Sequence, residues 1–134
     1  MKKIYIAGAI SSPVLEEGLK NLQQGIKAGA EVLKMGLYPY VPHLDYQFNL
    51  VQEDHIPVDI YYKYDLAWLE VCDCMLVLPG YEKSKGVAAE IDFAKKNKIP
   101  IFYSMDDIKH LAGLSELQQD VLIYEMQRDL IHGK

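Results

Sequence analysis

The chain has 134 residues, with 14 Lys and Arg against 19 Asp and Glu, which gives a formal net charge of −5. This length suits one domain. Because half of the residues are hydrophobic, the chain can bury a core and is not a disordered segment. The acidic balance excludes a protein that follows a nucleic-acid polymer, since such binding needs clustered Lys and Arg. It does not exclude a small anionic ligand bound at a local site.

The ends and the cysteines predict a cytoplasmic protein without a membrane partner. No apolar run approaches the ~20 residues of a membrane span. The apolar segment 4–10 resembles a signal peptide only superficially, because it is short and polar residues follow at once. The two cysteines, Cys72 and Cys74, are too close along a strand to bond to each other, and the four scattered histidines lack the spacing of a zinc site. We therefore expect reduced, buried thiols and no metal.

Strands and helices are predicted to alternate along the chain. Short buried strands are expected at 3–7, 37–41, 74–78 and 99–103, and helices at 13–36, 57–71 and 86–97, followed by a helical tail. Ser12 and Pro13 are typical of a helix start, as the N-cap and the first helical residue. The segment 42–56 shows no clear period and is expected to be a long loop.

This alternation is typical of βαβ units, in which helices cover both faces of a parallel sheet. We therefore expect one α/β domain over residues 1–134, with a Rossmann-like (flavodoxin-like) sheet of four to five strands, helices on both faces and a helical tail at about 106–134. In such sheets, ligands bind beyond the carboxyl ends of the strands. The expected ligand edge comprises 8–12, 42–45, 79–84 and 104–107.

Asp65 has an unusual place in the helix predicted at 57–71. A step of about 100° per residue places Asp59, Lys63 and Glu70 on a side that faces water. Asp65 projects instead with the apolar and aromatic residues. A carboxylate on such a face is costly unless it has a partner or a task. Asp65 is therefore either a structural acceptor for a tyrosine hydroxyl or a functional acid.

Glu90 lies at the border of the buried side of the helix predicted at 86–97, whose core residues are Val87, Ile91 and Ala94. It is also within about the first turn, where the helix dipole favours an ionised carboxylate. Because this helix starts at the ligand edge of the sheet, Glu90 could be a nucleophile. The alternative is a surface glutamate that complements the dipole.

Hydroxyl groups precede two of the predicted helices. Ser11 and Ser12 lie before the first helix, and Ser84 lies before the helix at 86–97. Hydroxyls together with free N–H groups at helix starts can bind a phosphate, although a simple N-cap is the alternative at each position. The turn from Gly8 to Ser11 is not a Walker loop and lacks the dinucleotide fingerprint.

Three short segments form a recognisable series. They are Tyr5-Ile6-Ala7-Gly8-Ala9-Ile10, then Asp65-Leu66-Ala67-Trp68-Leu69-Glu70 with Asp73, and Ser84-x-Gly86-Val87-x-x-Glu90. In order and spacing, over about residues 3–104, the series resembles the nucleoside 2-deoxyribosyltransferase superfamily. That superfamily includes the 2′-deoxynucleoside 5′-phosphate N-hydrolases and small relatives in bacteria and phages.

The resemblance implies chemistry at an N-glycosidic bond. The glutamate matching Glu90 attacks the sugar C1′ and forms a glycosyl-enzyme intermediate, which water or a second base resolves. The aspartate matching Asp65 assists the departing base or orients groups around it, and the tyrosine matching Tyr5 contacts the glutamate. His43 falls near a histidine that lines the base side in the hydrolases. The family works without a cofactor and as homodimers or larger assemblies, which implies the same here.

Ser84 bears on the substrate that the resemblance implies. Six residues before the glutamate, the nucleoside transferases carry an acidic residue that suits a free 5′-hydroxyl. The nucleotide hydrolases carry a serine there that binds the 5′-phosphate, so Ser84 favours a nucleoside 5′-monophosphate over a nucleoside. The expected catalytic residues are Glu90, Asp65 and Tyr5. The expected substrate-binding residues are Gly8, Ala9, Ile10, Ser11, Ser12, His43, Ser84 and Gly86.

Two other functions fit the same sequence. The pocket could belong to a non-catalytic protein that senses or sequesters a nucleotide, or the tyrosine-rich surface could belong to an α/β domain that mainly packs against partners. In the tail, a row of residues recurs at helical spacing: Leu114, Leu117, Val121, Tyr124 and Arg128. This row is either an interface with another subunit or a cover for the chain's own sheet.

Overall fold

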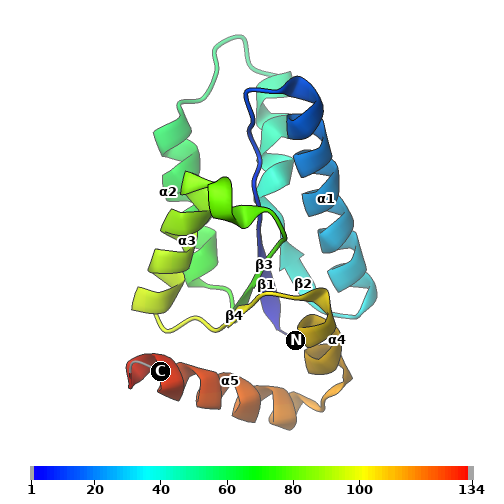
Figure 1. Ribbon diagram of the computed structural model, residues 1–134, viewed down its shortest axis with the longest axis vertical. Helices are drawn as coiled ribbons and strands as arrows, with labels where there is room; N and C mark the ends of the chain where they lie inside the picture. Colours follow the sequence, from blue (N-terminus) through cyan, green and yellow to red (C-terminus); the bar gives the residue numbers. More distant parts are fainter. Residues whose placement is uncertain (1, 133–134) are drawn as a thin grey trace.

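The sheet of the computed structural model, which describes residues 2–132, contains four parallel strands in the order β2-β1-β3-β4 (Figure 1). The strands are β1 (Lys3–Ala7), β2 (Tyr38–Tyr40), β3 (Cys74–Val77) and β4 (Ile101–Phe102). Strand β1 is central and pairs with β2 on one side, where Lys3 lies opposite Tyr38, and with β3 on the other, where Ile4 lies opposite Cys74. The predicted parallel α/β sheet is confirmed.

Helices cover both faces of the sheet, as predicted. They are α1 (Leu15–Lys34), α2 (Val58–Glu70), α3 (Lys85–Lys96), α4 (Met105–Gly113) and α5 (Glu116–Ile131), with two 3-10 segments, η1 (Pro42–Leu50) and η2 (Tyr81–Lys83). Helices α1 and α4 lie on one face, α2 and α3 on the other, and α5 crosses the end of the molecule where the chain starts (Figure 1). No helix within residues 2–132 has the length and apolar character that a bilayer crossing needs.

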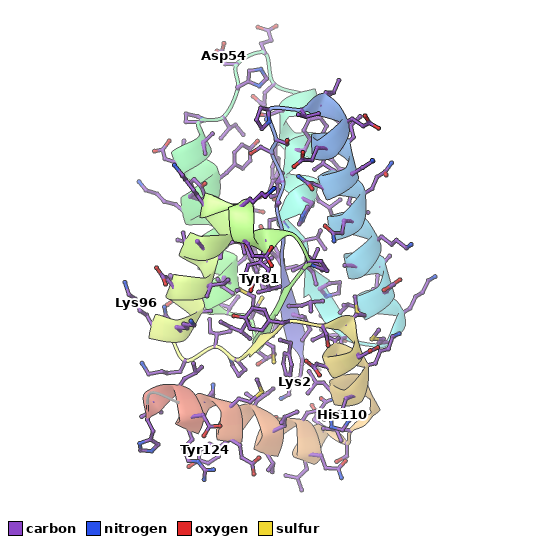
Figure 2. The ribbon with its side chains drawn as sticks, viewed as in Figure 1. Lys2, Asp54, Tyr81, Lys96, His110 and Tyr124 are labelled. Atoms are coloured by element: carbon purple, nitrogen blue, oxygen red, sulfur yellow. The ribbon has the colours of Figure 1, made fainter. Side chains whose placement is uncertain are left out.

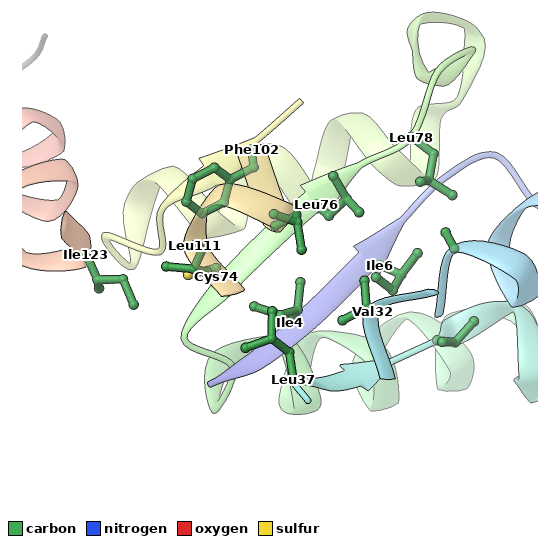
Figure 3. Close-up of a cluster of buried hydrophobic side chains, with 13 residues drawn as sticks. Ile4, Ile6, Val32, Leu37, Cys74, Leu76, Leu78, Phe102, Leu111 and Ile123 are labelled. Atoms are coloured by element: carbon green, nitrogen blue, oxygen red, sulfur yellow. The ribbon is translucent and has the colours of Figure 1, made fainter. Parts of the chain in front are cut away.

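Alternate side chains of β1 point to opposite faces of the sheet. Ile4 and Ile6 pack with residues of α1 and α4 in the cluster that Figure 3 shows. Tyr5 and Ala7 belong to a second cluster, formed with residues of α2 and α3. Tyr5 is 0% exposed. The sheet therefore buries a tyrosine on the face covered by α3, the helix that carries Glu90.

Cys72 and Cys74 are free and buried, which confirms the prediction. Cys72 belongs to the cluster beneath α2 and α3, whereas Cys74 belongs to the cluster beneath α1 and α4. The two thiols thus lie on opposite faces of the sheet and cannot approach each other.

Helix α1 begins later than its sequence indicates. Val14 precedes the first helical residue, Leu15, and no side chain caps this helix. The Ser12 Oγ instead accepts a hydrogen bond from the Val14 N–H at 3.2 Å. Such local hydroxyl-to-backbone bonds compete with helix formation. The predictions that Ser12 is the N-cap and that Pro13 is the first helical residue are therefore wrong.

Helix α1 turns small residues toward the core. Its buried residues are Gly25, Ala28, Gly29 and Val32. The large apolar residues lie on the outer side, where Leu15 is 78% exposed. A Cβ at Gly25 would lie 2.2 Å from the His43 ring, and a Cβ at Gly29 would lie 2.4 Å from the Val41 Cγ2. The glycines thus let α1 approach the chain that follows β2 more closely than a larger residue would allow.

The tail forms two helices rather than one. Ser104 caps α4, and Ser115 caps α5 in a capping box with Gln118. The residues of α5 that face the protein are Gln119 and Ile123. The exposed side carries Leu117, Val121 and Tyr124, and Tyr124 is labelled at the end of the molecule that α5 crosses (Figure 2). This row does not cover the chain's own sheet, and its use as an interface stays a prediction.

Candidate active site

Two tyrosines and three carboxylic acids from five elements interact on the α2–α3 side of the sheet. This carboxyl cluster consists of Tyr5 of β1, Tyr40 of β2, Asp45 of η1, Asp65 of α2 and Glu90 of α3. It contains all three residues predicted to be catalytic. They are far apart in the sequence and meet because β1, α2 and α3 pack against one another around the same core.

Glu90 is held by Tyr5, whose hydroxyl donates a hydrogen bond to the Glu90 Oε2. Burial raises the pKa of Glu90 to about 7, the hydrogen bond from Tyr5 opposes that rise, and the charge of Asp65 adds to it. Burial, with the charges of Glu90 and Asp65, also raises the pKa of Tyr5, which therefore stays a neutral donor. A partly buried carboxyl with a pKa raised toward neutral pH is typical of a catalytic acid, base or nucleophile.

Asp65 accepts a hydrogen bond from a tyrosine hydroxyl, as expected if it is a structural acceptor. Its Oδ1 accepts a hydrogen bond from the Tyr40 hydroxyl at 3.1 Å. Burial raises the pKa of Asp65, and hydrogen bonds with Asp45 and Tyr40 oppose that rise. A tyrosine partner and a functional role are compatible, because the second oxygen of a carboxyl group can interact elsewhere.

Asp45 belongs to the carboxyl cluster although no sequence pattern singled it out. The segment expected to be a loop forms the 3-10 helix η1, which presents Asp45 to Asp65. Burial raises the pKa of Asp45 to about 8, and the neighbouring carboxyls of Asp65 and Glu90 contribute to that rise. The available signal was position, because Asp45 follows the second strand at the ligand edge of the sheet.

Within residues 2–132, no salt bridge pairs these carboxyls with a positive charge. The side-chain salt bridges described within residues 2–132 join Lys2 to Asp120, Lys20 to Glu16 and Lys109 to Asp106. In the same part of the chain, no group of three or more His, Cys, Asp or Glu side chains is arranged to hold a metal ion. Neighbouring carboxylates without a cation disfavour each other's charge, so the carboxyl cluster retains protons into the neutral pH range.

A cavity of about 560 Å³ opens beside the carboxyl cluster. Tyr40, Asp45, Phe48 and Tyr64 contribute to its wall, which apolar residues of α1 complete. Tyr40 stacks on Trp68 with ring centroids 5.6 Å apart, and Phe48 meets Tyr64 edge-on at 6.0 Å. An apolar, aromatic wall with a few polar groups is typical of a site for a flat organic ring.

His43 is packed away from solvent, against α1. It is 1% exposed, and its ring lies against Gly25. Burial lowers its pKa to about 4, and both ring nitrogens are buried without a hydrogen-bond partner within residues 2–132. The imidazole is therefore neutral at neutral pH. The predicted contact of His43 with a base is untested by this packing and stays a prediction.

Ser84 is the N-cap of α3, the helix that carries Glu90. Its Oγ accepts a hydrogen bond from the Val87 N–H at 3.2 Å, which confirms the capping role and leaves the hydroxyl hydrogen free to donate. Gly86 lies close to Tyr62, since a Cβ added there would be 3.3 Å from the Tyr62 hydroxyl. Contact of Ser84 and Gly86 with a substrate stays a prediction.

The other predicted binding residues form the connection between β1 and α1: Gly8, Ala9, Ile10, Ser11 and Ser12. Gly8 is buried, and a Cβ there would lie 3.0 Å from the Leu78 Cδ1. The glycine thus permits a close approach of this connection to the chain that follows β3. The structure brings the three catalytic candidates together. Of the binding candidates, Gly8 and His43 also meet, since a Cβ at Gly8 would lie 3.4 Å from the His43 Nε2.

Comparison with known proteins places the chain in a family and identifies its fold. Residues 2–104 match the family described as Domain of unknown function (DUF7768). The chain belongs to this family. A comparison with curated proteins finds no match. Among solved structures, the chain is similar to a 2-deoxyribosyltransferase from the psychrotolerant bacterium Bacillus psychrosaccharolyticus, with a TM-score of 0.56 and 15% identity over 87% of this chain and 95% of that one. This likeness confirms the Rossmann-like α/β fold.

The carboxyl cluster predicts that the free energy of unfolding falls as the pH rises above neutrality. The pKa values of Glu90 and Asp45 are raised to about 7 and about 8, whereas ordinary carboxyls titrate near ~4. The folded protein therefore binds protons that the unfolded chain has already released. This stabilisation is complete below about pH 4 and is lost as the pH rises through about 7 and 8. Urea titrations at about pH 6.5 and about pH 8.5 measure the difference.

The lower pH of the urea titrations is about 6.5 because, below that value, His43 changes the free energy of unfolding in the opposite direction. With its pKa lowered to about 4, His43 reduces stability as the pH falls below the ordinary histidine value of ~6.5. In Glu90→Gln, the free energy of unfolding should fall less between the two pH values. Asp92→Asn, which changes an exposed acid of the same helix, should leave it unchanged. A fall of equal size in Glu90→Gln would contradict the prediction.

Proposed function

We propose that this protein cleaves or transfers at the N-glycosidic bond of a nucleoside 5′-monophosphate or nucleoside, through a covalent intermediate on Glu90. One observation carries the proposal: the partly buried Glu90 carboxyl accepts a hydrogen bond from the Tyr5 hydroxyl, and the charge of a second carboxyl, Asp65, raises its pKa. Breaking this bond requires a carboxylate at the developing oxocarbenium carbon and a proton or hydrogen bond for the leaving base. Glu90 and Asp65 supply one group for each task.

The reaction has two steps. In the first, the Glu90 carboxylate forms a bond to C1′ while the bond from C1′ to the base breaks and its electron pair leaves with the base. Asp65 assists by donating a proton or a hydrogen bond to that base. In the second step, water or another base attacks C1′ and releases Glu90. Tyr5 orients Glu90 throughout, and its neutral hydroxyl stabilises the carboxylate between turnovers.

Ser84 supports a phosphorylated substrate. It stands at the first turn of α3, where the helix dipole and free N–H groups favour an anion. Its hydroxyl hydrogen is free to donate, and Lys83 and Lys85 flank it in the sequence. Glu90 follows on the same helix, so a sugar whose 5′-phosphate is bound at Ser84 would extend toward the nucleophile.

The comparisons support the proposal at the level of the fold. The similar solved structure is a 2-deoxyribosyltransferase described as a biocatalyst for the synthesis of nucleosides. The aromatic cavity beside Asp45 gives a planar base a place to bind. These features agree with the order of the sequence segments that resemble the same superfamily.

Chromatographic detection of free base tests the proposal. The protein is incubated with a panel of ribo- and deoxyribonucleosides and their 5′-monophosphates, with and without an added acceptor base. Release of base from at least one compound is expected, and a new nucleoside in the presence of acceptor would identify transfer. Tight binding of a nucleotide by calorimetry, with no base released across the panel, would instead establish the non-catalytic alternative.

Tyr5→Phe should move the acidic limb of the pH–rate profile to higher pH. The hydrogen bond from Tyr5 opposes the effect of burial on the pKa of Glu90, so its loss raises that pKa and leaves less ionised nucleophile at neutral pH. The measurement is kcat/KM between about pH 5 and pH 9, where each unit of displacement lowers the rate on the acidic limb by about tenfold. Tyr38→Phe, at a half-exposed tyrosine of β2, is the control. A loss that is uniform across this pH range would contradict the assignment.

A further inference from the structure

Asp45 is the acid in the carboxyl cluster to which the proposed reaction assigns no task. Its carboxyl group, from η1, faces the carboxyl group of Asp65, from α2, within hydrogen-bonding reach. The Tyr40 hydroxyl already bonds to the Asp65 Oδ1. The Oδ2 of Asp45 is buried and has no hydrogen-bond partner within residues 2–132. Asp45 also lines the aromatic cavity, together with Tyr40.

Two carboxyl groups in this arrangement need a proton between them. An ionised carboxylate only accepts hydrogen bonds, so a bond between two carboxyls requires that one of them is protonated. No described salt bridge supplies a cation that would let both ionise. Glu90 of α3 raises the pKa of Asp45 by its charge, and Tyr40 of β2 lowers the pKa of Asp65 by its hydrogen bond. The carboxyls in turn raise the pKa values of Tyr5 of β1 and Tyr61 of α2. Burial and the charges of Asp65 and Glu90 favour retention of the proton on Asp45, whereas the hydrogen bond from Tyr40 favours ionisation of Asp65.

We propose that Asp45 is a positioning residue that shares one proton with Asp65 and so keeps an acid at the cavity wall for the departing base. The proposal rests on the function proposed above. It is supported by the pKa of Asp45, which burial and the neighbouring acids raise to about 8. The structure thereby supplies an acid at neutral pH, although an isolated aspartate would be ionised there.

The proton balance of the reaction follows from this pair. As the bond between C1′ and the base breaks, its electron pair enters the base, and the shared proton moves to a ring nitrogen of that base. Glu90 forms the new bond to C1′, and the pair is left with two negative charges. Water that attacks C1′ in the second step gives its hydroxyl to the sugar and its proton to the pair. The starting state is then restored without any other reagent.

The ¹³C NMR signals of aspartate carboxyl carbons test the shared proton without any substrate. In the unaltered protein, one carboxyl of the pair should keep its proton to about pH 8. In Asp45→Asn this step should disappear, because the acid that keeps its proton at this pH is removed. Asp65→Asn should lower the pKa of Asp45, because the charge of Asp65 and the hydrogen bond with it both raise that pKa. This second variant tests the pair independently if Asp45→Asn folds poorly.

The matched control is Asp59→Asn, which removes an exposed acid from the same helix as Asp65. It should leave both titrations unchanged. If the step near pH 8 persists in Asp45→Asn, or if Asp45 titrates at the same pH in Asp65→Asn as in the unaltered protein, the two carboxyls do not share a proton and the proposal is overturned.

The pH dependence of base release tests the role of the pair in the reaction. With a substrate identified in the panel, Asp45→Asn should move the alkaline limb of kcat/KM to lower pH, with a loss of about tenfold at pH 8 and a smaller loss at pH 6. A uniform loss at all pH values would assign Asp45 a structural role and overturn the proposal. If the unaltered protein releases no base, the proposed function fails, and the role in base departure fails with it. The NMR titration alone then decides whether the proton is shared.

Discussion

Glu90→Ala should abolish release of base from every compound that the unaltered protein cleaves. The variant lacks the carboxylate that forms the covalent intermediate, so kcat/KM should fall by at least about 10³-fold. The Tyr5 hydroxyl loses its acceptor but stays neutral, so the fold should persist. Chromatography of free base over long incubations measures the residual rate, and circular dichroism checks that the variant is folded.

Two further measurements separate loss of a nucleophile from general damage to the site. Azide or formate should restore base release in Glu90→Ala, because a small anion can occupy the vacated space and attack C1′. In the unaltered protein, mass spectrometry after rapid quenching should detect the added mass of the sugar on Glu90. Asp92→Asn, an exposed change on the same helix, should retain full activity. Retention of activity in Glu90→Ala would refute the proposed mechanism.

Gly25→Ala should destabilise the protein by about 2 kcal/mol. A Cβ at this position would lie 2.2 to 2.4 Å from three atoms of the His43 ring, and that ring is itself buried. Forcing a methyl group into a packed interior costs about 3 kcal/mol at the upper end of the usual range. The better helix propensity of alanine offsets about 1 kcal/mol of this cost. Urea unfolding measures the difference.

Gly18→Ala is the matched control in the same helix. The nearest atom to a Cβ at Gly18 is the Ser12 nitrogen at 3.9 Å, which is an ordinary contact. This variant should therefore stabilise the protein by about 0.5–1 kcal/mol. Combining Gly25→Ala with His43→Ala should cost less than the sum of the two single changes, because the ring that the methyl group meets is gone. Additive losses would show that the contact with His43 is not the cause.

The α2–α3 side of the sheet was predicted well because its pattern is local. The spacing of Val87, Ile91 and Ala94 predicted the buried side of α3, and Val87 and Ala94 are fully buried. The capping signal at Ser84 was equally local, since the hydroxyl bonds to an N–H three residues away. Asp65 could be noticed for the same reason, because helical spacing alone set it apart from the charged side of its helix.

Helix α1 was predicted less well because its packing depends on a partner distant in the sequence. Its large apolar residues indicated a helix correctly but not which side is buried. The buried side is made of small residues, since the segment after β2 approaches closely at Gly25 and Gly29. Such an approach leaves no trace in hydrophobic periodicity, which records the size and polarity of side chains and not the distance to a neighbouring element.

The sequence by itself determined the order of strands and helices, the parallel sheet and the two acids, Asp65 and Glu90, whose positions solvation does not explain. These follow from the periodicity of each element and from residues within one or two turns. The contact of Tyr5 with Glu90 was implied only by the resemblance, and only the tertiary structure decided that Asp45 joins Asp65. These contacts span 20 to 85 residues of chain. They exist because β1, η1, α2 and α3 converge on one side of the sheet, where burial gives the carboxyl cluster its raised pKa values.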